Sequence, residues 1–178
     1  MIGDLIYLRS FQIEDAEDLL LMQTQNKLFF EQYSMMRTND FYSMDYQKQM
    51  IKQFSQLKLQ GIEFHFGIFL NDTDQLIGTI DLFQLYRGSL QSAMIGYFIS
   101  HAHNGNGYAT EACKLLVNYA FSNLKLHRLE AGVMPRNLGS IRVLEKSGFH
   151  KEGIARKNVR INGVWEDHQV LACLNPND

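Results

Sequence analysis

Residues 104–112 read Asn-Gly-Asn-Gly-Tyr-Ala-Thr-Glu-Ala. Two successive Asn-Gly pairs usually indicate a β-hairpin. Here the following residues, 108–124, repeat apolar side chains at helical spacing, so we predict a strand, a glycine-rich loop and a helix in that order. Glycine lets backbone N–H groups approach an anion, and the helix N-terminus adds a partial positive charge. The segment therefore predicts a site for a phosphate or pyrophosphate group.

The common nucleotide-binding motifs are absent from the sequence. It contains no G-x-x-x-x-G-K-[ST] motif, which argues against a P-loop NTPase. It also lacks a G-x-G-x-x-G motif in a parallel βαβ unit followed by an acidic residue, which argues against a dinucleotide-binding (Rossmann) fold. A different class of phosphate-bearing ligand is expected.

Hydrophobic periodicity on both sides of this loop predicts one mixed α/β (α+β) domain over residues 1–178. We expect a mostly antiparallel sheet of about seven strands, flanked by about four helices. The expected strands are 4–9, 64–70, 76–83, 92–99, 128–134 and a pair within 148–174 around Asn162-Gly163. The expected helices are 12–24, 45–59, 108–124 and 138–147.

Composition narrows the class of protein. The 178 residues are 46% hydrophobic and carry a formal net charge of −2, which does not suit a protein built to hold nucleic acid. Nine Lys/Arg against three Glu give residues 125–160 a charge of +6, so the rest of the chain carries −8. An acidic body attracts a basic partner, although a solvated surface of mixed sign explains the same counts. The N-terminus does not resemble a signal peptide, no apolar run is long enough to span a membrane, and two cysteines fit a reduced, cytoplasmic protein.

The loop resembles the acyl-CoA loop of the GNAT acetyltransferases, in which six positions read Q/R-x-x-G-x-G/A. Those positions are 104–109 here, and Asn104 departs from the family's Gln or Arg. The resemblance continues in LRSFQIEDAEDLL at 8–20 and in 137–153, NLGSIRVLEKSGFHKEG. It implies an acyltransferase that passes acetyl directly from acetyl-CoA to a primary amine. It also implies a splayed strand pair that forms the acetyl-CoA cleft.

Two further segments are similar to the RimJ/RimL subgroup, whose members acetylate the N-terminal amines of ribosomal proteins. They are 29–51, FFEQYSMMRTNDFYSMDYQKQMI, and the ending RKNVRINGVWEDH at 156–168. The likeness implies a protein or peptide N-terminus as acceptor, and no nucleic acid or membrane partner. A small amine such as a polyamine is the alternative acceptor, and a non-catalytic acyl-CoA-binding module is the alternative class. A monomer and a homodimer both remain open.

The resemblance also implies which residues hold acetyl-CoA, with no metal ion required. Asn137 equally suits the N-cap of helix 138–147, and Arg142 equally suits a solvated surface position. The expected cofactor-binding residues are main-chain groups of Phe98 and Ile99, the loop and first helical turn Asn104, Gly105, Asn106, Gly107, Tyr108, Ala109 and Thr110, and the side chains of Asn137 and Arg142.

Proton transfer needs an acid for the departing thiolate and a base for the ammonium. Many family members have a Tyr where this chain has Leu144, and the subgroup assigns the acid role to a Ser in N-x-x-S, here Ser140. Ser140 also suits a local capping contact with the residue three positions before it. Glu63 is the first candidate base because it lies near the position of the subgroup's water-activating Glu. Asp81 and His101 are alternatives, and an amine of low pKa needs no dedicated base.

The cysteines do not suggest a covalent acyl-enzyme. Cys113 falls in line with the apolar positions of helix 108–124, and Cys173 lies in the last apolar strand. Neither has a histidine in a context that indicates a nucleophile and base pair. Direct transfer between two bound substrates is therefore expected.

Overall fold

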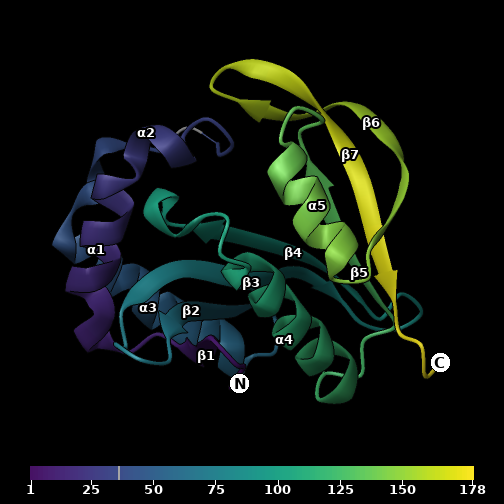
Figure 1. Ribbon diagram of the computed structural model, residues 1–178, viewed down its shortest axis with the longest axis horizontal. Coiled ribbons are helices and arrows are strands. Elements are labelled where there is room, and N and C mark those ends of the chain that lie inside the picture. Colours follow the sequence, from purple (N-terminus) through teal and green to yellow (C-terminus); the bar gives the residue numbers. More distant parts are fainter. Residues whose placement is uncertain (36) are drawn as a thin grey trace.

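The computed structural model describes residues 1–35 and 37–178 (Figure 1). Seven strands form one sheet in the order β1-β2-β3-β4-β5-β7-β6. The strands are Ile6–Ser10 (β1), Phe64–Leu70 (β2), Leu76–Tyr86 (β3), Ser92–Ile99 (β4), Arg128–Val133 (β5), His150–Ile161 (β6) and Val164–Leu174 (β7). The prediction of a seven-stranded mixed sheet is confirmed.

Five α-helices and three short 3-10 turns complete the described chain. The α-helices are Ala16–Gln25 (α1), Lys27–Phe30 (α2), Met44–Leu59 (α3), Tyr108–Ser122 (α4) and Leu138–Lys146 (α5). The 3-10 turns are Ile13–Asp15 (η1), Asn39–Tyr42 (η2) and His101–His103 (η3). The four longer helices confirm the four helices predicted from the sequence, and α2 was not predicted.

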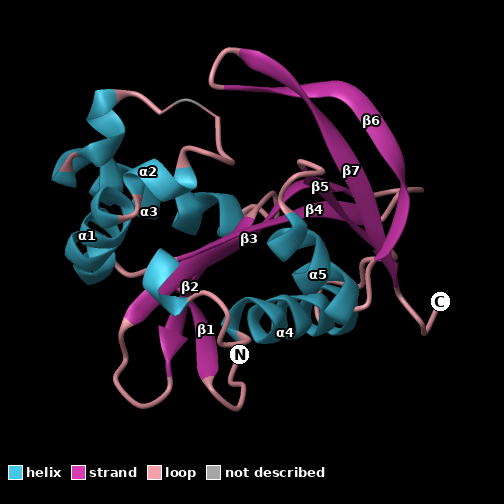
Figure 2. Ribbon diagram, turned by 45° about the horizontal axis from the view of Figure 1, so that its top comes forward, coloured by secondary structure: helices cyan, strands magenta, loops and turns pink. Residues whose placement is uncertain are grey.

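Helices lie on both faces of the sheet, as Figure 2 shows with helices in cyan and strands in magenta. One apolar cluster joins α4 and α5 to one face, and its largest buried members include Leu8, Ile80 and Leu116. A second cluster joins α1 and α3 to the other face around Leu19 and Phe69. Strand residues alternate between the two faces, so β1, β2 and β3 contribute side chains to both clusters, whereas β4, β5 and β7 contribute to the first.

The sheet opens between β4 and β5, the only parallel pair in the described chain. Their register covers Ser92 to Met94 on β4 and Arg128 to Glu130 on β5. β4 then continues to Ile99 without pairing to β5. Backbone groups along this free edge are open to another extended chain. The splayed strand pair predicted from the family resemblance is therefore present.

Local interactions explain most element boundaries. The Ser43 hydroxyl caps α3 by accepting from the backbone N–H of Tyr46 at 3.3 Å. Asn162 and Gly163 have φ of 48° and 85°, as a tight hairpin between twisted strands requires. The helix predicted at 12–24 instead begins as a 3-10 turn, because the Asp15 carboxylate accepts from the N–H of Gln12 at 2.7 Å.

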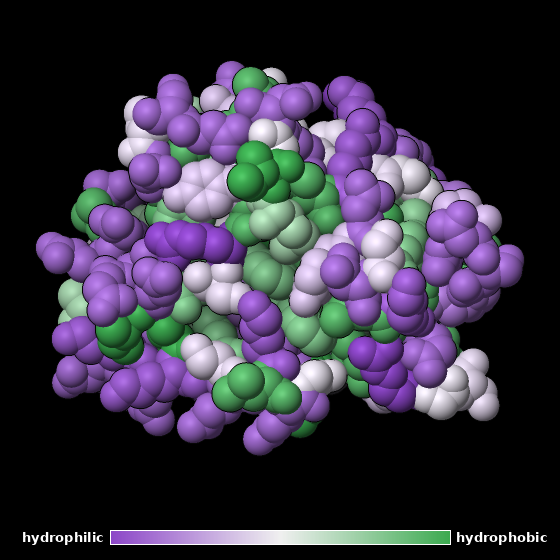
Figure 3. Space-filling view, turned by 90° about the horizontal axis from the view of Figure 1, so that it is seen from below, coloured by the Kyte–Doolittle hydropathy of each residue, from purple (hydrophilic) through white to green (hydrophobic). Residues whose placement is uncertain are grey.

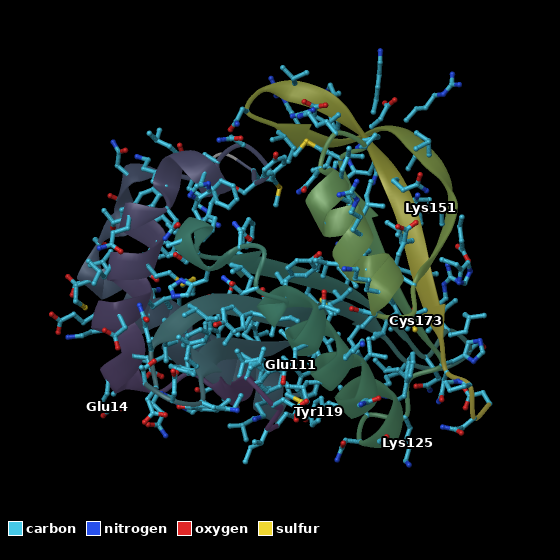
Figure 4. The ribbon with its side chains drawn as sticks, viewed as in Figure 1. Glu14, Glu111, Tyr119, Lys125, Lys151 and Cys173 are labelled. Atoms are coloured by element: carbon cyan, nitrogen blue, oxygen red, sulfur yellow. The ribbon has the colours of Figure 1, made fainter. Side chains whose placement is uncertain are left out.

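Helix α4 is attached to the sheet by side chains that Figure 4 labels. Glu111 accepts from the backbone N–H of Leu5 at 3.1 Å, which joins the start of α4 to the N-terminal segment. Tyr119 packs edge-on against Phe64 and Phe66 of β2, with ring centroids 6.0 and 5.7 Å apart. These contacts attach α4 to the N-terminal segment and to β2.

The remaining surface is of mixed polarity. Figure 3 shows the face seen from below Figure 1, where hydrophobic residues near the centre are bordered by hydrophilic ones. Among the described helices, none combines the length and apolar character needed to cross a membrane.

Candidate active site

The glycine-rich loop presents free backbone N–H groups at the start of α4. Gly105 and Gly107 adopt φ of 84° and 86°, conformations that side chains other than glycine rarely take. Within residues 1–35 and 37–178, the N–H groups of 105–110 have no protein acceptor. The Asn106 amide supports the loop by donating to the carbonyl of His103 at 3.2 Å. A row of unpaired donors at a helix N-terminus is suited to bind phosphate.

The free edge of β4 leads to this loop. Phe98 and Ile99 are its last two residues, and η3 then connects them to Asn104. The loop is exposed, whereas Tyr108, Ala109 and Thr110 in the first turn of α4 are half-buried. The residues expected to hold the donor thus form one path, from the unpaired strand edge to the N-terminus of α4.

Helix α5 borders the cleft on its other side. Asn137 is its N-cap, and its side chain accepts from the N–H of Ser140 at 3.2 Å, so the capping alternative is present. Ser147, near the other end of α5, donates to the carbonyl of Val143 at 2.8 Å, and its hydroxyl oxygen lies 3.4 Å from the carbonyl oxygen of Thr110 on α4. Ser140 and Ser147 therefore lie on the side of α5 that faces β4 and α4. Arg142 is exposed, and helical spacing of about 100° per residue places it on the opposite side.

The Ser140 hydroxyl contacts a residue that the sequence analysis did not select. Tyr97 of β4 places its hydroxyl oxygen 2.8 Å from Ser140 Oγ and 3.1 Å from the Ser140 carbonyl oxygen. Burial raises the pKa of Tyr97, so its hydroxyl remains protonated. Leu144 is fully buried and belongs to the core, so the position at which the family resemblance implies a Tyr carries no hydroxyl.

On the other face of the sheet, two candidate carboxylates share a histidine. His65 Nε2 lies 2.8 Å from Glu63 Oε2, and His65 Nδ1 lies 2.9 Å from Asp81 Oδ1. The His65 ring also stacks on Phe54 of α3, with centroids 3.9 Å apart. The sequence analysis missed His65. Two signals for it were the i, i+2 spacing to Glu63, which puts both on one strand face, and its place in the strand preceding Asp81.

The group Glu63–His65–Asp81 places two carboxyl groups around one imidazole. Each contact needs one proton between nitrogen and oxygen, so the imidazole holds or shares a proton on both sides. Burial disfavours the imidazolium, but hydrogen bonds and charges from Asp81 and Glu63 outweigh it and raise the pKa of His65. Burial also raises the pKa of Asp81, although its side chain is 25% exposed. Two carboxylates around one cation leave a site that attracts an ammonium group.

The segment after α2 and the β6–β7 hairpin meet near the end of β4. Asn162 at the hairpin turn donates to the carbonyl of Glu31 at 2.6 Å. Phe98 packs on Phe30, with ring centroids 5.0 Å apart. Arg37 lies 5.4 Å from the Phe98 ring. Two residues of the segment 29–51, Phe30 and Arg37, thus lie next to the end of β4, and Met36 of that segment lies outside the described residues.

The other candidates lie apart from these groups or inside the core. His101 is exposed, packs edge-on against Phe29 at 4.8 Å, and donates its backbone N–H to Asn26. Cys113 and Cys173 are buried, and burial raises the pKa of both thiols. A buried thiol that stays protonated is a poor nucleophile, which agrees with the core placement expected for Cys113.

Loop, splayed strands and flanking helices define an acyltransferase site of the GNAT type. A family model described as an acetyltransferase (GNAT) domain matches residues 6–150, and the chain belongs to this family. The protein is an N-acetyltransferase.

The relatives agree with this assignment along nearly the whole chain. The chain is 60% identical to the "Probable N-acetyltransferase YjcK" of Bacillus subtilis, over 99% of this chain and 97% of that protein. It is 31% identical to the "[Ribosomal protein uS5]-alanine N-acetyltransferase" of Escherichia coli, over 97% and 89%. Its fold matches that of Mycobacterium smegmatis RimJ in complex with CoA-disulfide with a TM-score of 0.92 at 26% identity, covering 98% and 87%.

Proposed function

We propose that this protein transfers the acetyl group of acetyl-CoA to the N-terminal α-amine of a protein, and that the acceptor is a ribosomal protein. The use of acetyl-CoA is supported above all by the row of free N–H groups at 105–110 beside the unpaired edge of β4. A protein N-terminus as the acetyl acceptor is supported by the contact of the β6–β7 hairpin with Glu31. Similarity to a ribosomal-protein alanine acetyltransferase supports the same acceptor class.

The donor is held by backbone more than by side chains. The pyrophosphate of acetyl-CoA accepts hydrogen bonds from the loop Asn104–Gly107 and from the first turn of α4. The pantetheine arm extends along β4 and pairs with main-chain groups of Phe98 and Ile99. Asn137 caps α5 next to Ser140, and Arg142, on the opposite side of that helix, is the outermost candidate for a CoA phosphate.

The acetyl group passes directly from the sulfur of CoA to the acceptor nitrogen, without an acyl-enzyme. The neutral amine attacks the thioester carbonyl, the C–S bond breaks after the tetrahedral adduct forms, and the sulfur leaves as a thiolate. Ser140 gives its hydroxyl proton to that sulfur and regains one from the acceptor nitrogen, which must lose one to become the amide. Holding both substrates in one cleft supplies much of the rate by replacing a bimolecular encounter. No cysteine takes part, because Cys113 and Cys173 are buried.

The ammonium of the acceptor is attracted by the acidic group Glu63–His65–Asp81. Asp81 pairs with Gly96 of β4, so it is one strand from the free edge, while His65 is two strands away. Glu63 is 30% exposed on the far side of His65 and is the member that accepts, through water, the proton that the ammonium loses before the neutral amine attacks. His65 keeps both carboxylates in place through its two ring nitrogens.

A peptide fits the acceptor side better than a polyamine does. Arg37 places a guanidinium 5.4 Å from the Phe98 ring, at the end of the free edge. A fixed cation there repels the second ammonium of a polyamine and attracts the carbonyl groups that follow a peptide's α-amine. The hairpin and the segment after α2 enclose a longer acceptor by their contact at Glu31.

The test compares acceptors at one fixed salt concentration, read by release of free CoA thiol. Basic peptides that begin with Ala or Ser should show kcat/KM at least tenfold above spermidine. The matched control is the same peptide with a blocked N-terminus and its lysines intact, which should not react. A tenfold advantage for spermidine would replace the peptide with a small amine, and no turnover with any amine would leave an acyl-CoA-binding module.

A further inference from the structure

We infer that Tyr97 is a positioning residue for the reaction, because its hydroxyl directs the Ser140 hydroxyl toward the acyl-CoA cleft. This inference rests on the proposed role of Ser140 and extends it to a residue on the opposite side of the cleft. Tyr97 belongs to β4, beyond the last residue that pairs with β5, whereas Ser140 belongs to the helix that follows β5. Their hydrogen bond therefore joins the two sides of the splayed strand pair.

A count of protons defines what Tyr97 does. Its oxygen is 2.8 Å from Ser140 Oγ and 3.1 Å from the Ser140 carbonyl oxygen, but it has one proton to donate. If that proton goes to the carbonyl, Ser140 must donate its own proton to Tyr97 and has none for the cleft. If it goes to Ser140 Oγ, the Ser140 proton is free to point at the sulfur. The contact with Oγ is the shorter one and has the usual length of an O–H···O bond.

The surroundings of Tyr97 keep it a donor throughout the reaction. Burial raises the pKa of Tyr97, so the phenol does not lose its proton when the serine oxygen becomes more negative. As Ser140 gives its proton to the thiolate, the Tyr97 O–H bond to Oγ becomes charge-assisted and stronger. Tyr97 thus stabilises the transition state without exchanging a proton itself.

The same geometry compensates for Leu144. That residue is fully buried and lacks a hydroxyl, so α5 carries no tyrosine acid at this position. Tyr97 provides a phenol from β4, but its hydroxyl bonds to Ser140 and is buried beneath it. The two hydroxyls act in series, with Ser140 toward the sulfur and Tyr97 behind it.

The experiment is a double-mutant cycle with Tyr97→Phe and Ser140→Ala. Tyr97→Phe should lower kcat about tenfold and Ser140→Ala about 10²-fold, within the range for lost proton-transfer help. KM and the calorimetric Kd for acetyl-CoA should stay within twofold in both. The double variant should be no slower than Ser140→Ala alone, because Tyr97 acts only through Ser140. Tyr119→Phe is the matched control: it removes a phenol from the same core layer and should leave kcat unchanged.

The outcomes separate this inference from the proposed function. Unchanged kcat in folded Tyr97→Phe, with a large loss in Ser140→Ala, overturns the role of Tyr97 and leaves the Ser140 acid in place. A double variant slower than Ser140→Ala by a further tenfold also overturns it, because Tyr97 would then act independently. Equal losses in kcat and in acetyl-CoA affinity would make Tyr97 a structural residue. Unchanged kcat in Ser140→Ala refutes the acid role itself, and the inference with it.

Discussion

Replacing Gly107 with valine tests whether the loop holds the donor through its backbone. Gly107 has φ of 86° and is the N-cap of α4, where the free N–H groups begin their helical turn. A Cβ built there meets no atom within 4 Å, so the side chain has room in the free protein. It would instead occupy the space in front of the loop, where pyrophosphate must approach the backbone. The valine side chain should therefore lower the affinity of the protein for CoA.

The size of the loss follows from the hydrogen bonds involved. A hydrogen bond between a neutral donor and a charged acceptor contributes about 1.5–3 kcal/mol. Losing one such contact to a phosphate would weaken binding by roughly 10- to 150-fold, since about 1.4 kcal/mol corresponds to tenfold. We expect at least a tenfold rise in the calorimetric Kd for CoA.

Gly61→Val is the control for backbone strain. Gly61 follows α3, has φ of 69° and likewise has no atom within 4 Å of its Cβ position. Both variants force valine into a left-handed conformation, which costs about 1–3 kcal/mol of folding free energy. Only Gly107→Val should lose CoA affinity. An unchanged Kd in folded Gly107→Val, or an equal loss in Gly61→Val, would refute the assignment of the loop.

Two further predictions concern the core and its ion pairs. The double variant Cys113→Ala, Cys173→Ala should keep most of its kcat if it stays folded, and mass spectrometry of the wild type should find no acetyl-cysteine; a trapped acetyl-cysteine would contradict direct transfer. Burial opposes ionisation of Asp15, but hydrogen bonds, first from Arg9, outweigh it and hold the pKa of that carboxyl below its usual range. The stabilisation that ionised Asp15 adds to the free energy of unfolding is present above the pKa of an aspartate in the unfolded chain, about 3.9. It is lost as the pH falls through the lower pKa of Asp15 in the folded protein. Asp15→Asn should therefore cost about 1–3 kcal/mol in urea unfolding at pH 7 and much less in acid. The exposed Asp18→Asn is its control, and equal losses in the two would contradict the pair.

The conformation of the candidate donor loop was predictable from the sequence because its signals are local. Two glycines at the positions that need positive φ, followed at once by a helical pattern, identify a helix N-terminus without any knowledge of the rest of the fold. The Asn162-Gly163 hairpin is of the same kind. The splayed pair was predicted from the family resemblance and is confirmed by the short register between β4 and β5. The boundaries of β3 and α1 moved by a few residues, as end effects do.

The partners of the candidate catalytic residues were not predictable in the same way. His65 joins Glu63 to Asp81 because β2 and β3 pair with His65 opposite Asp81, and a shift of one residue would put that side chain on the other face. Tyr97 reaches Ser140 across 43 positions of sequence. Short α2 was missed because four residues are too few to show a helical period.

The alternation of side chains along β4 explains how the proposed groups on opposite faces of the sheet would serve one reaction. Tyr97 faces α4 and α5, where it meets Ser140, whereas Phe98 faces α2, and Gly96 pairs with Asp81. In a continuous sheet the backbone would separate these two environments completely. The loss of pairing between β4 and β5 beyond Met94 removes that barrier, so the thiolate acid and the acidic group that attracts the ammonium can approach one thioester from opposite sides. In the proposed mechanism the splay thus serves the proton transfers as well as donor binding.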